Sequence, residues 1–197
     1  STADVTMTGE STGDYFGVSV SSAGDINGDG FSDVIVGAER YSSITGRAYI
    51  YFGGGAMNNI ADVTMTGETT NNFFGISVSA AGDLNGDGYS DVIVGAYGYS
   101  SFTGRAYIYF GGTNMNNDED VSITGEATNN FYGVSVSSAG DVNGDGYSDV
   151  IAGAFGYSTN KGRVYLYDYF MKNEITHDMS MTGDATGNLF GHSVSSA

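Results

Sequence analysis

Short apolar stretches alternate with glycine-rich, acidic polar stretches along the whole chain. The first four apolar stretches are rich in Val, Ile, Tyr and Thr, and each is too short for an amphipathic helix. They predict β-strands over residues 16–22, 33–38, 47–52 and 62–66. The second stretch contains the continuous apolar run Val34-Ile35-Val36, which predicts a strand buried on both faces. The fourth alternates apolar and polar residues, which is typical of an outer strand with one wetter face.

This pattern recurs every 58 residues: Phe16-Gly17 returns as Phe74-Gly75, Tyr132-Gly133 and Phe190-Gly191. Helical repeats need long segments with a 3.6-residue period, and β-solenoid coils are far shorter than 58 residues, so neither class fits. Four short strands joined by short connections predict an antiparallel sheet of the kind found in β-propeller blades. We therefore expect an all-β fold built from blades of four antiparallel strands.

The period divides the chain into five parts. Residues 1–8 are expected to hold an outer strand of a preceding or closing blade, over residues 4–8. Three complete repeats follow at 9–66, 67–124 and 125–182, and residues 183–197 begin a fourth repeat. Three complete blades with flanking strands do not close a ring. The sequence therefore predicts a partial propeller, or one completed by an oligomer or by further blades from the same parent chain.

The composition of the chain excludes several classes of function. The chain has 6 Lys and Arg against 23 Asp and Glu, and its net charge is −17. Binding to nucleic acid or to an anionic membrane surface is excluded, because both need clustered Lys and Arg. No apolar stretch approaches the roughly 18 residues of a membrane helix. The chain has no Cys, which excludes disulfides and thiolate zinc sites. The polar residues at its start do not resemble a signal peptide, so an export signal is expected outside this sequence.

The acidic residues gather in one repeated segment, Asp-x-Asn-Gly-Asp-Gly-x-Ser-Asp, at residues 25–33, 83–91 and 141–149. Carboxylates or amides occupy loop positions 1, 3, 5 and 9, and the glycine at position 6 permits a turn after which the carbonyl of position 7 can face an ion. Oxygen ligands in a flexible loop favour Ca²⁺ over Mg²⁺. The alternative is a plain Asp/Asn/Gly turn. Three copies with three mutually repelling carboxylates each favour calcium, with about three ions per chain.

The segment is no EF-hand loop. An EF-hand needs a bidentate Glu at position 12, where this chain has Val36, Val94 or Ala152 inside an apolar strand. The pattern thus predicts a calcium-binding loop between two β-strands.

The order of motifs in each repeat resembles the FG-GAP repeat of integrin alpha-chain propellers and related bacterial surface proteins. In the first repeat it is Phe16-Gly17, then the acidic segment, then Val34-Ile35-Val36-Gly37-Ala38. The resemblance covers nearly the whole chain, although the final Pro of the motif's name is absent. It implies four-stranded blades with an outward-facing calcium loop between the first two strands, an extracellular interaction role, and no catalysis by the propeller. Carried over by position, the implied ligands are the side chains of Asp25, Asn27, Asp29 and Asp33 with the Phe31 carbonyl; of Asp83, Asn85, Asp87 and Asp91 with the Tyr89 carbonyl; and of Asp141, Asn143, Asp145 and Asp149 with the Tyr147 carbonyl.

Other recurring side chains have two interpretations each. Arg47, Arg105 and Arg163 are expected to pair with acids of the same or next blade, among Glu10, Glu68, Glu126 and Asp184, or to contact a ligand. Tyr41, Tyr99 and Tyr157, with Tyr97, Phe102 and Phe155 nearby, either pack between blades or form an aromatic binding rim. His177 and His192 have no recurring partner, so no catalytic residue is expected. The individual connection at residues 168–174 is a candidate partner contact.

Together these observations predict a secreted or cell-surface, calcium-stabilised adhesion or interaction module, not an enzyme, with a protein or glycan ligand. Two alternatives remain open. One is a structural repeat of a cell-surface filament or sheath, and the other is a non-catalytic propeller attached to a secreted hydrolase.

Overall fold

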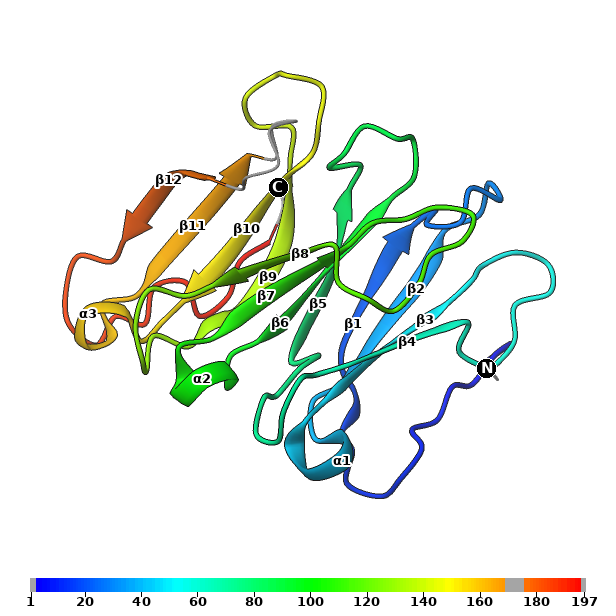
Figure 1. Cartoon of the computed structure of the whole chain (residues 1–197), viewed down its shortest axis with the longest axis horizontal. Helices are drawn as coiled ribbons and strands as arrows, with labels where there is room; N and C mark the ends of the chain where they lie inside the picture. The colour runs from blue at the N-terminus through cyan, green and yellow to red at the C-terminus, as the bar shows by residue number, and fades with distance from the viewer. Residues whose placement is uncertain (1–2, 169–175, 196–197) are drawn as a thin grey trace.

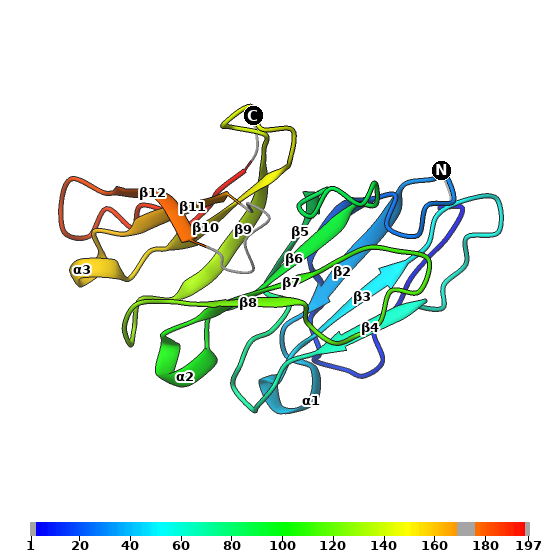
Figure 2. The same ribbon diagram turned by 45° about the horizontal axis from the view of Figure 1, so that its top comes forward.

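The computed structural model describes residues 3–168 and 176–195, and in these residues it contains three four-stranded antiparallel sheets (Figure 1). The first sheet contains β1 (Phe16–Gly24), β2 (Asp33–Ala38), β3 (Arg47–Tyr51) and β4 (Val63–Thr66). The second contains β5 (Ser77–Gly82), β6 (Asp91–Ala96), β7 (Arg105–Tyr109) and β8 (Val121–Thr124). The third contains β9 (Tyr132–Gly140), β10 (Asp149–Ala154), β11 (Arg163–Asp168) and β12 (Thr176–Thr182). Strands neighbour one another in chain order, and the sheets are not closed into a ring (Figure 2). This confirms the prediction of an all-β fold of propeller blades.

The pairing register repeats from sheet to sheet. Ile35 on β2 lies opposite Ile50 on β3, and Ile93 lies opposite Ile108 in the second sheet. Because side chains alternate between the two faces of a strand, this register keeps equivalent residues on equivalent faces of each sheet.

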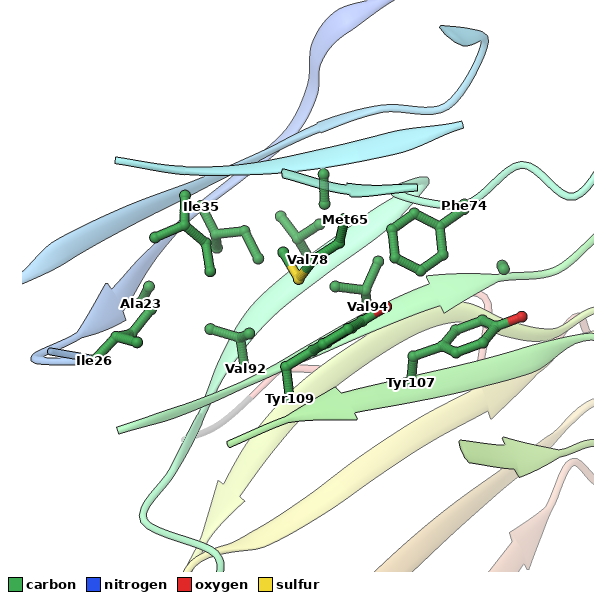
Figure 3. Close-up of a cluster of buried hydrophobic side chains, with 13 residues drawn as sticks. Ala23, Ile26, Ile35, Met65, Phe74, Val78, Val92, Val94, Tyr107 and Tyr109 are labelled. Atoms are coloured by element: carbon green, nitrogen blue, oxygen red, sulfur yellow. The ribbon is translucent and has the colours of Figure 1, made fainter. Parts of the chain in front are cut away.

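The cores lie between the sheets rather than within one. In Figure 3, Ile35 and Met65 of the first sheet meet Val78, Val92 and Val94 of the second, and all five side chains are buried. A second cluster joins the second sheet to the third in the same way. The middle sheet is therefore covered on both faces, and its β6 strand, which contains the apolar run 92–94, is buried along its whole length. The strand for which the sequence predicts burial on both faces, β2, is buried except at Val34, which is half-buried.

The outer face of the third sheet lacks such a cover in the described residues. Val142 is 52% exposed, whereas its counterparts Ile26 and Leu84 are 0% exposed. Phe190 is 39% exposed, whereas its counterpart Phe74 is fully buried. The same repeat position thus occurs in a covered and an open state within one chain.

The predicted strand over residues 4–8 is wrong, because the structure assigns no strand there. As the counterpart of β4, this segment would have to pair with the third strand of a blade, and among the described residues β3, β7 and β11 already have an outer strand as neighbour. Met7 nevertheless packs against the apolar face formed by Val36, Tyr49 and Tyr51. Its side chain therefore covers the first sheet, as its counterpart Met65 covers the second.

Three four-residue turns were not predicted: α1 (Tyr41–Ile44), α2 (Tyr99–Phe102) and α3 (Tyr157–Asn160). In α1 the φ angles of Ser42, Ser43 and Ile44 are 46°, 61° and 66°, so the turn is left-handed. Its last carbonyl accepts a hydrogen bond from the N–H of Phe73 at 3.0 Å, in the loop that leads into the next blade. This bond helps to hold the strained turn in place.

One close backbone approach needs glycine. Gly37 on β2 faces the carbonyl of Gly75, and a Cβ at Gly37 would overlap that oxygen; Gly95 faces Gly133 in the same way. The Phe-Gly and Gly-Ala parts of the repeat are therefore among the points where consecutive blades touch. Within the described residues, no helix has the length and apolar character needed to cross a membrane.

Candidate metal centre

The three acidic segments lie between β1 and β2, β5 and β6, and β9 and β10, so they share one end of the blades. In the first, the Asp25 carboxylate accepts hydrogen bonds from the N–H groups of Gly28, Asp29 and Gly30 at 2.8, 3.0 and 2.9 Å. The φ angles of Gly28 and Gly30 are 77° and 88°, which a side chain would resist. The other two loops repeat these bonds to Asp83 and Asp141.

The middle positions also turn into the loop. The Asn27 side-chain oxygen accepts a hydrogen bond from the Asp29 N–H at 2.9 Å, and the Asn27 amide donates to the Asp29 carboxylate at 3.2 Å. The Phe31 N–H donates to the other Asp29 oxygen at 2.9 Å. The loop backbone thus gathers oxygen atoms from positions 1, 3 and 5.

The last acid of each loop is buried. Asp33 is 0% exposed, and its carboxylate accepts hydrogen bonds from the N–H groups of Ile26 and Gly53, both at 2.8 Å. Burial raises the pKa of Asp33, and burial raises the pKa of Asp91 to about 7, with a smaller contribution from the negative charges of Asp87 and Asp83. A bound cation would favour the charged form of this carboxylate and offset the repulsion.

The fifteen predicted ligands therefore fall into three separate loops of like geometry. Their oxygen-only chemistry fits a hard cation such as Ca²⁺. Within residues 3–168 and 176–195, however, no three His, Cys, Asp or Glu side chains are gathered closely enough to form a metal cluster by themselves. The assignment of these ligands remains a prediction.

The recurring arginines form ion pairs, as expected. The Nη1 atoms of Arg47, Arg105 and Arg163 lie 2.8, 2.9 and 3.0 Å from the carboxylates of Glu10, Glu68 and Glu126. Each pair lies within one repeat. In the second repeat, the Nε of Arg105 also donates to Thr124 at 2.9 Å and the hydroxyl of Tyr107 donates to Glu68 at 2.6 Å.

The recurring tyrosines of the left-handed turns complete these clusters. Each guanidinium lies over a tyrosine ring, at 3.8 Å from the Tyr41 centroid, 3.7 Å from Tyr99 and 3.6 Å from Tyr157. The structure therefore places these three tyrosines on their own arginines, which the sequence interpretation missed. The recurring Tyr six residues before each Arg was the available signal.

The other three aromatic side chains lie in a row with two more that the sequence reasoning missed. We call Phe73, Tyr97, Phe102, Phe131 and Phe155 the aromatic row. Ring centroids in it are 4.6 Å apart for Phe73 and Tyr97, 5.3 Å for Phe102 and Phe131, and 4.7 Å for Phe131 and Phe155. The row lies on loops after β4, β6, β8 and β10, and is therefore at the end of the blades opposite the acidic loops.

Three further predictions have limited outcomes. The ring of His192 lies 5.4 Å from Phe155, at the edge of the aromatic row. The side chain of His177 lies outside the described residues. The candidate partner contact at 168–174 lies outside them too, apart from Asp168.

A family model described as FG-GAP repeat matches residues 16–51, 74–109 and 132–167, one match for each sheet. The chain belongs to the FG-GAP repeat family. Among curated relatives, it is 33% identical over 178 residues to integrin alpha-5 of Xenopus laevis, 37% over 159 residues to integrin alpha-6 of Gallus gallus and 34% over 170 residues to integrin alpha-PS3 of Drosophila melanogaster. These matches cover 82%, 77% and 81% of this chain but 17%, 14% and 15% of the relatives. The predicted resemblance is confirmed, and the chain spans less than a fifth of each of these FG-GAP relatives.

Proposed function

We propose that this FG-GAP chain is a calcium-stabilised binding module of a secreted or cell-surface protein, with an adhesion role and no catalysis of its own. The observation that carries the proposal is the acidic loop, which occurs three times with the same side-chain hydrogen bonds to its own backbone. Membership of the FG-GAP family and the similarity to integrin alpha chains support the adhesion role.

Calcium has a structural part in this proposal. In the first loop it would be held by the side chains of Asp25, Asn27, Asp29 and Asp33 and by the Phe31 carbonyl, and equivalent residues would hold it in the other two. The ion supplies positive charge among carboxylates that repel one another, the last of which is buried in each loop. Extracellular calcium modules have Kd values of about 10⁻⁴ to 10⁻³ M, which suits an extracellular location.

Thermal unfolding in EDTA and in about 10 mM calcium tests the metal. With a Kd of about 1 mM, each occupied loop adds about 1.4 kcal/mol, or roughly 4 kcal/mol for three loops. Asp29→Ala should remove at least about a third of this gain while leaving the melting temperature in EDTA nearly unchanged. Equal melting temperatures with and without calcium would contradict the proposal.

The aromatic row is the binding surface that the proposal favours. Stacked aromatic side chains at one end of a rigid scaffold are typical of interface hot spots, and Phe102 is 36% exposed. Its partner is a protein or a glycan. We would screen the labelled chain on a glycan array and on immobilised extracellular-matrix proteins. Binding should be lost in Phe102→Ser and retained in Phe31→Ser, because Phe31 is an exposed ring at the opposite end.

A structural repeat in a surface filament or sheath is the second candidate. It is favoured by the open apolar face of the third sheet, where Met179 and Met181 are 56% and 43% exposed. Light scattering in calcium and in EDTA tests it. Growing particles of increasing mass in calcium favour the filament, whereas a particle of fixed mass favours the discrete module.

A further inference from the structure

The acidic loops of consecutive blades touch each other directly. The N–H of Ser90 in the second loop donates a hydrogen bond to the carbonyl of Asp25 in the first, at 3.0 Å, and Ser148 makes the same bond to Asp83 at 3.0 Å. Asp25 and Asp83 are the first predicted ligands of their loops. Ser90 lies between two others, the Tyr89 carbonyl and Asp91. The bond therefore ties predicted ligand positions of one loop to those of the next.

Side chains strengthen the same contact. The Tyr89 ring lies over Gly28, where a Cβ would come within 2.5 Å of the ring edge, and the Tyr147 ring leaves no room for a Cβ at Gly86. The N–H of Gly112, from the loop after β7, also donates to the carbonyl of Ile26 at 2.7 Å. The turn of the first loop is thus packed against the second blade.

The contacts are absent at the two ends of the described loop series. A Cβ at Gly144 in the third loop would meet nothing within 4 Å, in contrast to Gly28 and Gly86. Phe31 holds the same loop position as Tyr89 and Tyr147, but it is 54% exposed and lies against Gly54 of its own blade. The middle loop therefore has a loop neighbour on each side, and each end loop has one.

We propose that the three loops bind calcium with positive cooperativity, passed from each loop to its neighbour through these contacts. The inference rests on the proposed calcium binding. An ion that orders one loop fixes the carbonyl of its first residue and its glycine turn, which are the surfaces that the next loop packs against. The second ion then has less disorder to remove, so its affinity rises, and by linkage the effect is reciprocal.

The test is a calcium titration of ¹⁵N-labelled chain by NMR, with the amide signals of Gly30, Gly88 and Gly146 as one probe for each loop. Asp141→Ala disables the third loop without touching residues outside it, because among the described residues the Asp141 side chain accepts hydrogen bonds only from its own loop. The calcium midpoint of Gly88 should rise at least about 5-fold, the lower end of typical coupling, and the midpoint of Gly30 should rise less. Unchanged midpoints at Gly88 and Gly30 would overturn the proposal.

A second variant removes the side-chain part of the contact and keeps every predicted ligand. Tyr147→Ala removes the ring over Gly86 but leaves the backbone bond from Ser148 to Asp83. The shift of the Gly88 midpoint caused by Asp141→Ala should therefore be smaller in the Tyr147→Ala background. Phe31→Ala is the matched control, because this half-exposed ring lies against Gly54 of its own blade and contacts no other acidic loop among the described residues. It should leave the coupling intact. If none of the three glycine signals responds to calcium, the proposed function itself fails. If all three respond and Asp141→Ala shifts only its own loop, calcium binding stands and the coupling is refuted.

Discussion

Replacing Phe74 with Ala measures how much one interface between blades contributes to stability. Phe74 is fully buried, and its ring meets Tyr107 and Tyr109 edge to face at centroid distances of 5.2 and 6.5 Å. Removing a buried Phe from such a site costs about 3–5 kcal/mol, through lost transfer free energy and the cavity left behind. For a chain of this size, each kcal/mol lowers the melting temperature by roughly 2–4 °C, so a decrease of roughly 6–20 °C is expected.

The repeat supplies the control at the equivalent position. Phe190 is 39% exposed, so Phe190→Ala loses only part of the free energy gained by removing the ring from water. Water can fill the space left at the surface, so no buried cavity forms. Its cost should be about 1 kcal/mol. Both variants would be unfolded with urea and followed by circular dichroism, in EDTA so that calcium does not contribute. Equal losses from the two variants would refute the inference that the packing between blades, rather than the Phe-Gly motif itself, provides the stability.

Three further predictions concern other parts of the fold. A double-mutant cycle on Arg105 and Glu68, measured by urea unfolding, should give a coupling free energy of about 1 kcal/mol, because the two side chains are 19% and 39% exposed. Arg105→Lys should lose part of this coupling. A coupling free energy of zero would contradict a stabilising ion pair. Burial raises the pKa of the Glu39 carboxyl, so the protonated form of Glu39 favours the folded state. The stability that this group contributes is fully present below its ordinary pKa of 4.5. It is lost as the pH rises through the raised pKa of the folded state. Glu39→Gln should therefore stabilise the chain more at about pH 7 than at about pH 4 in urea titrations, and equal effects at both pH values would refute the argument. Gly95→Ala should lower the stability several times more than Gly55→Ala. A Cβ at Gly95 overlaps the Gly133 carbonyl, whereas a Cβ at Gly55 meets nothing within 4 Å. Similar melting temperatures of the two variants would contradict the close approach of Gly95 to Gly133.

The sequence predicts the sheets well because their signals are local. The strand over 33–38 is placed at its observed bounds, and the one over 47–52 ends one residue late. The segment at 4–8 fails because strand formation depends on a partner far away in space, which no local pattern reports. The left-handed turns fail for a different reason: the positive φ angles at Ser42, Ser43 and Ile44 are stabilised in part by a hydrogen bond from the next blade, which no local pattern reports.

In the acidic loops and the ion pairs too, the sequence predicts local features and misses contacts between repeats. Carboxylate and amide spacing predicts where the acidic loops lie, because a loop that curls on itself is a local structure. The contact from Tyr89 to Gly28 joins two repeats and leaves no signal in either loop alone. The pairing of Arg47 with Glu10 was predicted from charge and recurrence, but the Tyr41 ring under the guanidinium depends on the unpredicted turn.

Identical strands in adjacent blades have a consequence for refolding. The sequences of β2 and β6 are both DVIVGA, and those of β3 and β7 are both RAYIY, with the same cross-strand register. A hairpin that pairs β2 with β7 therefore satisfies the same hydrogen bonds and side-chain contacts as the native one, and loses only the entropy of a longer loop. We expect such exchanged hairpins to act as kinetic traps when the first two repeats refold. The third repeat has DVIAGA and RVYLYD instead, so pairing with its strands would not reproduce the same side-chain contacts.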